Sequence, residues 1–577
     1  MARTNGPIRA RGRSRRHPVR RRKDPTRARR EQERRDQPRP LWAFSNDDRG
    51  NGQRFIEVHG ADVAWVPDTK ATHVWLGSRW EADTDARMRN LAHLLTDQML
   101  SEAKIRCALL QADYDAVEHL DPKNPDRIKA KEKRDTAEQF LKWSKSSRMD
   151  ARLKACVTSA IANPGTSVKS GRWDAHTQLL NTGNGTLELH LDGSHTFREH
   201  RQDDRLTQQA DLEYDPDAGY PTFVRYLDRT LPNPEVRRVV RALAGLSLLG
   251  DNNHHIFPVL IGKGRCGKTT LLEVLAGVLD NAAEPAIAYS GSFSLAILRP
   301  KQGGGAGPNA SLFRITSRRF VYCSESNDGV ALNAELVKRF CGGDRQEARD
   351  TYDRARGISD RVPAFTPWLG TNRAPEIEGA DDALRERIPV IPFYQYLEPN
   401  ERDPHLVQKI LAEKSGVLNW MLDGHRDIME NPHIIRDLPA ECVEAAKDLY
   451  RSMNLYRRWI DDETVPGDDN NKQDWITVDA SWRSFTEWCQ DQRETSGTKH
   501  KFGQALAVEG HPSVPVHVDI GGGKRSTIRR RQGITWSPEH LKRDQATHRG
   551  GDAPTATDPT TTAEQVAALA AEAALAT

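Results

Sequence analysis

The spacing of apolar residues divides the first half of the chain into strand-like and helix-like stretches. Residues 72–83 predict two short strands around a Gly-Ser turn, and residues 84–117 place apolar side chains at helical intervals. The charged stretch 121–153 predicts an exposed helix, and residues 171–197 return to strands broken by Asn-Gly and Asp-Gly turns. Residues 236–250 predict an amphipathic helix that ends at a glycine.

The second half of the chain begins with a repeated strand and helix pattern. Residues 255–395 alternate short apolar runs with helical spacing, which predicts an α/β fold with a parallel sheet and helical crossovers. A long connecting helix is expected over 435–463. Residues 475–536 predict two helices and a basic strand pair, and a disordered Thr/Ala/Pro-rich tail is expected from 538 onward.

Charge is distributed unevenly along the chain. The 577 residues include 85 Lys and Arg against 81 Asp and Glu, a net charge of +4. Residues 1–40 contain 16 basic and 4 acidic residues, a net charge of +12, which leaves −8 for the rest of the chain. We expect residues 1–50 to form a disordered basic leader that attracts phosphate backbones; the alternative is a solvated extension without function.

Several classes of protein are excluded by composition. No apolar run reaches the roughly 18 residues needed to cross a bilayer, and the N-terminal arginines lack the apolar segment of a secretory signal peptide. The seven cysteines are scattered and form no CxxC pair, which argues against a zinc ribbon and fits a reducing compartment. A cytoplasmic protein without a membrane partner is therefore expected.

The sequence GKGRCGKT, residues 262–269, matches the phosphate-binding pattern GxxxxGK[ST]. Glycines let backbone N–H groups cradle phosphate oxygens, Lys268 can reach the β- and γ-phosphates, and the Thr269 hydroxyl can ligate Mg²⁺. An apolar run precedes the motif and a helical pattern follows, which points a helix N-terminus at the phosphates. The alternative is a glycine-rich turn with an exposed lysine. The expected ATP site comprises Gly262, Lys263, Gly264, Arg265, Cys266, Gly267, Lys268, Thr269 and Thr270.

Two later strand patterns end in polar side chains suited to hydrolysis. Glu325 follows an apolar run and can order Mg²⁺ and polarise water, although Ser324 stands where the usual pattern has an aspartate. Asn372 follows the next run and can hydrogen-bond the attacking water or the γ-phosphate. Parallel strands deliver both residues to one edge of a sheet. The alternatives are a surface acid at a strand end and a turn-forming asparagine.

Arg385 and Arg387 stand just before another predicted strand. An arginine in such a position can act across a subunit interface as a finger on the γ-phosphate. The alternative is a pair of exposed arginines with local acidic partners.

In this order the motifs resemble the superfamily 3 helicases, in particular the phage and plasmid primase-helicases related to the poxvirus helicase-primase. The resemblance covers roughly residues 55–535. It implies a AAA+-like ATPase that assembles as a ring, usually a hexamer, around DNA and unwinds it 3′→5′ during replication. It implies nucleotide and Mg²⁺ binding by Lys268 and Thr269, water polarisation by Glu325, sensing by Asn372 and an arginine finger at Arg387. The matching segments are LLNTGNGTLELH, YDPDAGYPTF, GKGRCGKTT, RRFVYCSE, LVKRFCGGDRQEARDTY, PWLGTNRAP and LRERIPVIPF.

The resemblance also implies two DNA-binding regions. A hairpin after Gly342 is expected to enter the ring channel; the alternative is an ordinary surface loop with balanced charge. Residues 481–536 resemble a winged-helix module that contacts phosphates without reading bases; the alternative is a helical cap used for packing. The basic residues of the hairpin region are Lys338, Arg349, Arg354 and Arg356, and those of the module are Lys499, Lys501, Lys524, Arg525, Arg529, Arg530 and Arg531.

No acidic metal centre of the primase type is recognisable, and residues 190–195 are interpreted as a hairpin turn rather than a metal site. Priming is therefore expected on a separate primase or polymerase. The expected regions are a leader (1–50), an accessory α+β domain (51–235), an ATPase domain (236–400), a helical connector (401–465), a winged-helix module (466–537) and a disordered tail (538–577).

The predicted function is that of an ATP-dependent replicative DNA helicase acting on single-stranded or forked DNA, in the cytoplasm of a bacterial host if a phage or plasmid encodes it. Two alternatives remain open at this point: a bifunctional primase-helicase, and an ATP-switched replication initiator or loader that does not unwind DNA. A packaging motor is disfavoured because it predicts a nuclease domain, and no acidic cluster suggests one.

Overall fold

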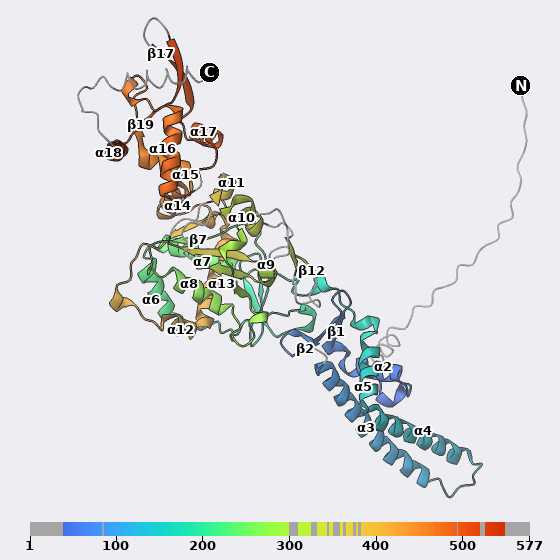
Figure 1. Cartoon of the computed structure of the whole chain (residues 1–577). Helices are drawn as coiled ribbons and strands as arrows, with labels where there is room; N and C mark the ends of the chain where they lie inside the picture. Colours follow the sequence, from blue (N-terminus) through green and yellow to red (C-terminus); the bar gives the residue numbers. More distant parts are fainter. Residues whose placement is uncertain are drawn as a thin grey trace, which may run out of the picture. The chain divides into compact units, whose positions relative to one another are not determined.

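The computed structural model of the protein divides into two compact units, with the boundary after Arg172, and each unit is described by itself (Figure 1). The structure describes residues 38–83, 86–298, 310–324, 332–342, 346–349, 358–361, 365–372, 377–378, 382–492, 494, 496–519 and 525–548.

The first unit packs helices on a small antiparallel sheet of order β1-β2-β3. Gly77, with φ +90°, forms the turn between β2 and β3. The long helices α3 and α4 run side by side as a hairpin (Figure 1). The elements are η1 (Leu41–Ala43), α2 (Asp48–His59), β1 (Val63–Val66), β2 (Ala71–Trp75), β3 (Trp80–Asp83), α3 (Ala86–Asp115), α4 (Pro125–Ser147) and α5 (Asp150–Ile161).

The predicted strand pair and the helix that follows it are confirmed, and two expectations in this unit are corrected. The charged stretch 121–153 is not one helix, because α4 ends at Ser147 and α5 begins at Asp150. The expected leader is folded at its C-terminal end: Leu41 is buried, and the Asp47 carboxylate caps α2 by accepting from the Gly50 N–H at 2.6 Å. Residues 1–37 lie outside the described part of the chain.

A parallel sheet of five strands forms the centre of the second unit, as the alternating pattern predicted. The strand order is β15-β7-β13-β9-β8, and every neighbouring pair is parallel. This order places β13 between the strands β7 and β9. The strands are β7 (Val259–Ile261), β8 (Ser290–Ser292), β9 (Phe320–Cys323), β13 (Thr366–Thr371) and β15 (Val390–Pro392).

Both faces of this sheet are covered. Leu260 and Trp368 face a core shared with α7, α8 and α13, whereas the neighbouring residues Val259 and Leu369 face a second core shared with α10. Because side chains alternate along a strand, a strand buried on both faces appears as a continuous apolar run. The helices of this region are α6 (Pro221–Thr230), α7 (Pro234–Leu246), α8 (Lys268–Val278), α9 (Ala310–Ile315), α10 (Ala334–Cys341), α11 (Asp382–Arg385), α12 (Leu406–Leu411) and α13 (Lys414–Glu430).

Residues 173–235 belong to this second unit, which differs from the expected accessory domain over 51–235. Their small antiparallel sheet places Leu180 and Leu187 in the same hydrophobic core as α8 and the parallel sheet. Hydrophobic burial therefore joins these strands to the sheet that follows them in sequence. The strands are β4 (Leu179–Asn181), β5 (Thr186–Leu189) and β6 (His195–Arg198), and the Asp-Gly turn between β5 and β6 is confirmed, with Gly193 at φ +84°.

The expected long helix over 435–463 is two helices. The Asn454 side chain caps the second one by accepting from the N–H groups of Tyr456 and Arg457 at 3.0 and 3.1 Å. The two helices and the basic strand pair predicted over 475–536 are confirmed, but residues 538–548 are helical rather than part of a disordered tail. The elements are α14 (Ala440–Met453), α15 (Leu455–Glu463), β16 (Thr464–Pro466), α16 (Val478–Asp491), α17 (Lys499–Val508), β17 (Ser513–Asp519), β18 (Arg525–Arg531), β19 (Ile534–Trp536) and α18 (Pro538–His548).

Among the described residues, no helix is both long enough and apolar enough to cross a membrane.

Candidate functional site

The glycine-rich loop, residues 262–267, connects the end of β7 to the first residue of α8. A Cβ on Gly262 would lie 2.1 Å from the carbonyl oxygen of Phe393, and one on Gly267 would lie 2.7 Å from the Thr230 methyl group. Gly267 also has φ +97°, which side-chain-bearing residues rarely adopt. Two of the motif's fixed glycines are thus required by the packing and backbone of the loop itself.

Lys268 turns its ammonium group into this loop. Its Nζ donates to the carbonyl oxygens of Gly262 and Lys263 at 2.8 and 3.1 Å, and the residue is only 6% exposed. A buried ammonium needs such partners, and a phosphate group could replace the carbonyl oxygens with stronger charge-assisted bonds. The loop and its lysine therefore fit an anionic ligand.

Asn372 meets the same ammonium from another strand. The residue follows β13, which pairs with β7 through Thr371 and Ile261. Its Oδ1 accepts a hydrogen bond from Lys268 Nζ at 3.0 Å, and its side chain is otherwise exposed. Sequence analysis named these two residues separately, and the strand order brings them together.

The remaining residues of the predicted phosphate site are divided between surface and interior. Thr269, the second residue of α8, is exposed, so its hydroxyl is accessible to a metal ion at the helix N-terminus. Cys266 is buried and its thiol donates to the Lys263 carbonyl oxygen at 2.9 Å. The exposed loop residues are Lys263, Gly264 and Arg265, and Thr270 is half-buried.

Tyr226 and Thr230 of α6 brace the loop, and sequence analysis missed both. The Tyr226 hydroxyl donates to the Gly267 carbonyl oxygen at 2.8 Å, while the Thr230 methyl group packs on Gly267. Burial raises the pKa of Tyr226, so the phenol stays a neutral donor. No local pattern marks these residues, because their role arises from packing between elements distant in sequence.

Glu325 lies outside the described residues. The strand that leads to it, β9, pairs directly with β13, and Ser324 is exposed at the same edge of the sheet as Asn372. Among the described residues, no group of His, Cys, Asp and Glu side chains is arranged to hold a metal ion.

Arg387 contacts its own chain. Its Nη1 donates to the Lys338 carbonyl oxygen at 3.3 Å, in the last turn of α10. A cation there complements the negative end of the helix dipole. The Arg387 backbone oxygen accepts from the Phe257 N–H at 2.7 Å, just before β7, which fixes the residue beside the central strand. Arg385 is exposed, and its guanidinium lies 5.3 Å from the ring of Tyr450.

The hairpin expected after Gly342 has an ordered stem. Strands β11 (Gln346–Arg349) and β12 (Ile358–Arg361) pair antiparallel, with Arg349 opposite Ile358. Arg354 and Arg356 fall between these strands and lie outside the described residues, as does the side chain of Arg349. Lys338 is half-buried on α10.

The basic residues of the C-terminal module separate into outward and inward groups. Arg529 is exposed and its Nε donates to the Ser513 hydroxyl at 3.0 Å, Lys501 is exposed, and Lys499 forms an ion pair with Asp479. Lys524 and the side chain of Arg525 lie outside the described residues.

The assignment of Arg530 and Arg531 to a DNA-binding surface is corrected. Arg531 is 1% exposed, with its guanidinium 5.3 Å from the Phe502 ring, and burial lowers its pKa. Arg530 is 7% exposed, pairs with Asp469 and lies over the Trp475 ring at 4.8 Å. Consecutive side chains on a strand point to opposite faces, so both faces of β18 are covered at this point, by Trp475 over Arg530 and by Phe502 over Arg531.

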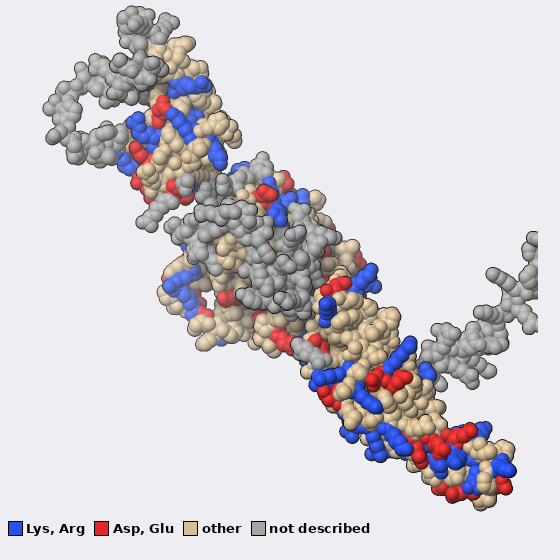
Figure 2. Space-filling view, turned by 45° about the vertical axis from the view of Figure 1, so that its right-hand side comes forward, with Lys and Arg blue, Asp and Glu red and all other residues tan. Residues whose placement is uncertain are grey.

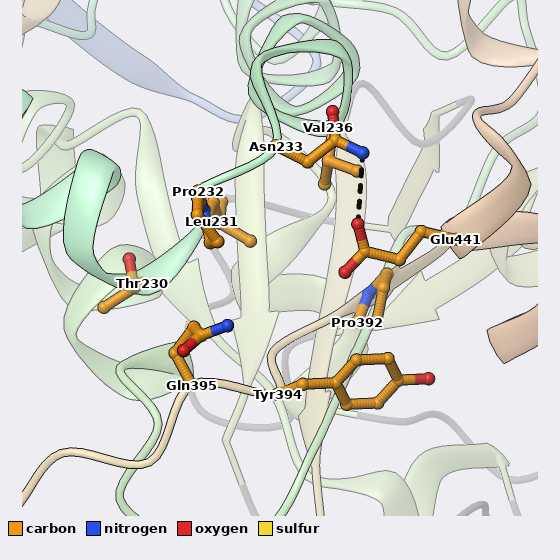
Figure 3. Close-up of a pocket in the computed structure, with 9 residues that line it drawn as sticks. All are labelled: Thr230, Leu231, Pro232, Asn233, Val236, Pro392, Tyr394, Gln395 and Glu441. Atoms are coloured by element: carbon orange, nitrogen blue, oxygen red, sulfur yellow. Dashed lines mark hydrogen bonds between the residues drawn. The ribbon is translucent and has the colours of Figure 1, made fainter.

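A small polar hollow adjoins the glycine-rich loop (Figure 3). Thr230, which packs on Gly267, lines one side, and Tyr394 and Gln395, which follow β15, line another. Across it, Asn233 Nδ2 donates to the Glu441 carboxylate at 3.1 Å. The hollow lies on the β15 side of β7, whereas Asn372 lies on the β13 side.

The fold and loop define an α/β protein with a candidate anion site at the edge of a parallel sheet. Residues 52–232 match the family described as "D5 N terminal like". The chain is similar to "Putative helicase L207/L206" of Acanthamoeba polyphaga mimivirus, with 26% identity over 55% of this chain and 33% of that protein. It is also similar to "Putative helicase 022R" of Frog virus 3 (isolate Goorha), with 22% identity over 49% of this chain and 29% of that protein.

The match thus spans about a third of the length of these curated relatives. Among solved structures, the chain is similar to the apo structure of the NrS-1 C-terminal region (305–718), with 9% identity, a TM-score of 0.41, and coverage of 84% of this chain and 99% of that one.

Proposed function

We propose that the chain is an ATP-dependent replicative DNA helicase of superfamily 3, encoded by a phage or plasmid, which forms a hexameric ring and moves 3′→5′ along DNA. The contact between Lys268 and Asn372 carries this proposal, because it joins a phosphate-binding lysine to a polar sensor on the neighbouring strand. Similarity to viral proteins named as helicases supports the same function.

Hydrolysis begins when the ATP phosphates replace the carbonyl oxygens that now hold the Lys268 ammonium. Asn372 then hydrogen-bonds the terminal phosphate or the attacking water, and Glu325 polarises that water. Mg²⁺, when bound, neutralises phosphate charge, and the exposed Thr269 hydroxyl together with Glu325 is the ligand set that we propose.

The strand order suggests how the nucleotide is oriented. Asn372 lies on the β13 side of the loop, so the terminal phosphate lies there too. The rest of the nucleotide then extends toward β15, where the polar hollow of Figure 3 lies.

Arg387 completes the site of a neighbouring subunit in this proposal. To do so it must leave the Lys338 carbonyl oxygen, so the arginine alternates between its own α10 and the neighbour's γ-phosphate. Because α10 leads into the β11–β12 hairpin, this movement of Arg387 couples ATP hydrolysis to the basic residues that contact DNA. Those residues are Lys338, Arg349, Arg354 and Arg356, with Lys499, Lys501, Lys524, Arg525 and Arg529 in the C-terminal module.

A fork-unwinding assay on a 3′-tailed substrate, with and without ATP, tests the proposal together with a mass measurement of the assembly. Unwinding that requires ATP and a 3′ tail, by a hexamer, is the expected result. ATP hydrolysis without strand displacement would favour an initiator or loader, and primer synthesis on a single-stranded template would favour a primase-helicase.

A further inference from the structure

A second hollow, a cleft of about 460 Å³, lies entirely within the first unit, between the sheet and helices α3 and α5. Small-molecule and cofactor sites occupy roughly 300–1,000 Å³, so the cleft is large enough for one nucleotide. The glycine-rich loop belongs to the other unit, and none of its residues lines this cleft.

One wall of the cleft is apolar. Met88 of α3 lines it, together with Leu153, Val157 and Ile161 of α5, which follow one another at intervals of four residues. Residues spaced in this way share one face of a helix. The wall therefore offers hydrocarbon side chains to the apolar face of a ligand.

Two cations stand together at the rim. Arg89 of α3 and Lys154 of α5 line the cleft and share the Asp150 carboxylate, at 3.5 and 3.0 Å. The hydrogen bond from Lys154 lowers the pKa of Asp150, so the carboxylate stays charged. Two cations on one anion leave one net positive charge facing the cleft.

Lys70 adds a third cation from the β1–β2 turn. It lines the cleft and has φ +54°, a left-handed conformation that glycine or asparagine adopts at lower cost.

The one carboxylate that lines the cleft already has partners. The oxygens of Asp83 accept from the backbone N–H groups of Arg87 and Met88 at 3.1 and 2.9 Å, at the start of α3. Elsewhere on this unit, Lys and Arg alternate with Asp and Glu over the surface (Figure 2). With Asp83 and Asp150 counted, the three cations leave one net positive charge at the cleft, beside its apolar wall.

We infer that this cleft binds a nucleotide unit of single-stranded nucleic acid, with its base on the apolar wall and its phosphate between Lys70, Arg89 and Lys154. The face of a base can pack on hydrocarbon side chains whatever the sequence, and backbone phosphates are anions that match the rim. The cleft thus recognises a strand without reading its sequence.

The test uses the full chain without nucleotide and measures its affinity for a fluorescent dT oligonucleotide across a series of salt concentrations. The variant Lys70→Gly/Lys154→Ala removes two cleft cations, and its glycine suits the local backbone, so thermal stability should not fall. The matched control, Lys129→Ala/Lys131→Ala, removes two exposed cations from α4 outside the cleft.

We expect the cleft variant to bind about tenfold more weakly, with a salt slope smaller by about 0.7, since the contact to one single-strand phosphate is lost. The control should change affinity less than twofold. Equal losses in both variants, or no loss in either, would overturn the inference.

Photocrosslinking distinguishes a failure of the cleft inference from a failure of the helicase proposal. A strand carrying 4-thiothymidine should crosslink to peptides that contain Met88 or residues 153–161, whether or not the protein hydrolyses ATP. Crosslinks confined to the second unit would overturn the inference about the cleft and leave the helicase proposal intact. An rU oligonucleotide and free dTMP distinguish a preference for DNA, for RNA or for a mononucleotide.

Discussion

The Lys268 ammonium donates a hydrogen bond to Asn372 Oδ1 over 3.0 Å, although 104 positions separate the two residues in the chain. Parallel pairing of β7 with β13 sets this contact, because it brings Ile261, which leads into the loop, into register with Thr371, which precedes Asn372. The relationship identifies the strongest candidate for a catalytic centre in the described chain and leads to the first two predictions.

Lys268→Ala should abolish ATP hydrolysis and unwinding. Removal of one preorganised donor that stabilises charge developing in the transition state typically costs about 10²–10³ in rate. Lys447→Ala, which removes an exposed ammonium on α14, serves as the matched control and should behave as wild type. Steady-state phosphate release measures the ATPase activity of both variants. Full activity in Lys268→Ala would disprove the assignment of residues 262–269 as a phosphate-binding loop.

Asn372→Ala should still bind ATP, because the loop carbonyl oxygens hold Lys268 in place. It should hydrolyse ATP about 10²-fold more slowly, because the terminal phosphate loses the amide that positions it. Asn372→Asp should weaken binding itself, since the phosphate would have to displace a carboxylate paired with the ammonium. Fluorescent-nucleotide titration and single-turnover hydrolysis separate the two effects. Identical behaviour of both variants would contradict this reasoning.

Arg387→Ala should retain nucleotide binding and lose about 10³-fold or more in ATPase activity. Its neighbour Arg385, which lies against Tyr450, gives the control variant Arg385→Ala. Mixing Arg387→Ala with Lys268→Ala subunits tests whether Arg387 acts on the ATP site of the neighbouring subunit. Each substitution lies on a different side of that site, so a mixed assembly contains sites in which both residues are intact. If mixed assemblies recover no ATPase activity, Arg387 acts only within its own subunit.

Arg529 and Arg531 lie two positions apart on β18 and should respond differently to mutation. Arg529→Ala should lower DNA affinity and reduce the salt slope by roughly one, because this guanidinium is exposed. Arg531→Met should leave DNA binding unchanged and keep or raise the melting temperature, since it replaces a buried cation whose Nη1 has no partner with an apolar side chain of similar length. Loss of DNA binding in Arg531→Met would contradict its interior placement.

Glu463 should make the docking of α18 dependent on pH. Burial opposes ionisation, but hydrogen bonds from His540 and Arg543 prevail and lower the pKa of Glu463 below its ordinary value of 4.5. A lowered folded-state pKa gives stability that is present above the unfolded value and is lost as pH falls through the folded one.

Hydrogen exchange of residues 538–548 measures that dependence. Protection in wild type should exceed that in Glu463→Gln at pH 6, and the difference should shrink below about pH 4.5. A constant difference between the two proteins from pH 6 to pH 3.5 would show that the carboxylate does not hold α18.

The local elements of this protein follow from its sequence. Strand-like runs, Gly-rich turns and the phosphate-loop pattern each depend on residues within a few positions of one another, so their periodicity and backbone requirements are visible in the chain. The apolar runs around β7, β9 and β13, and the need for glycine at 262 and 267, belong to this group.

Only the tertiary structure decided which of these elements meet. Strand order joined Lys268 to Asn372, and burial placed β4–β6 with the parallel sheet rather than with the first unit. The same packing turned Arg531 inward and recruited Tyr226 to the loop. Such outcomes depend on contacts between distant segments, whose energies a linear pattern of residue types does not contain.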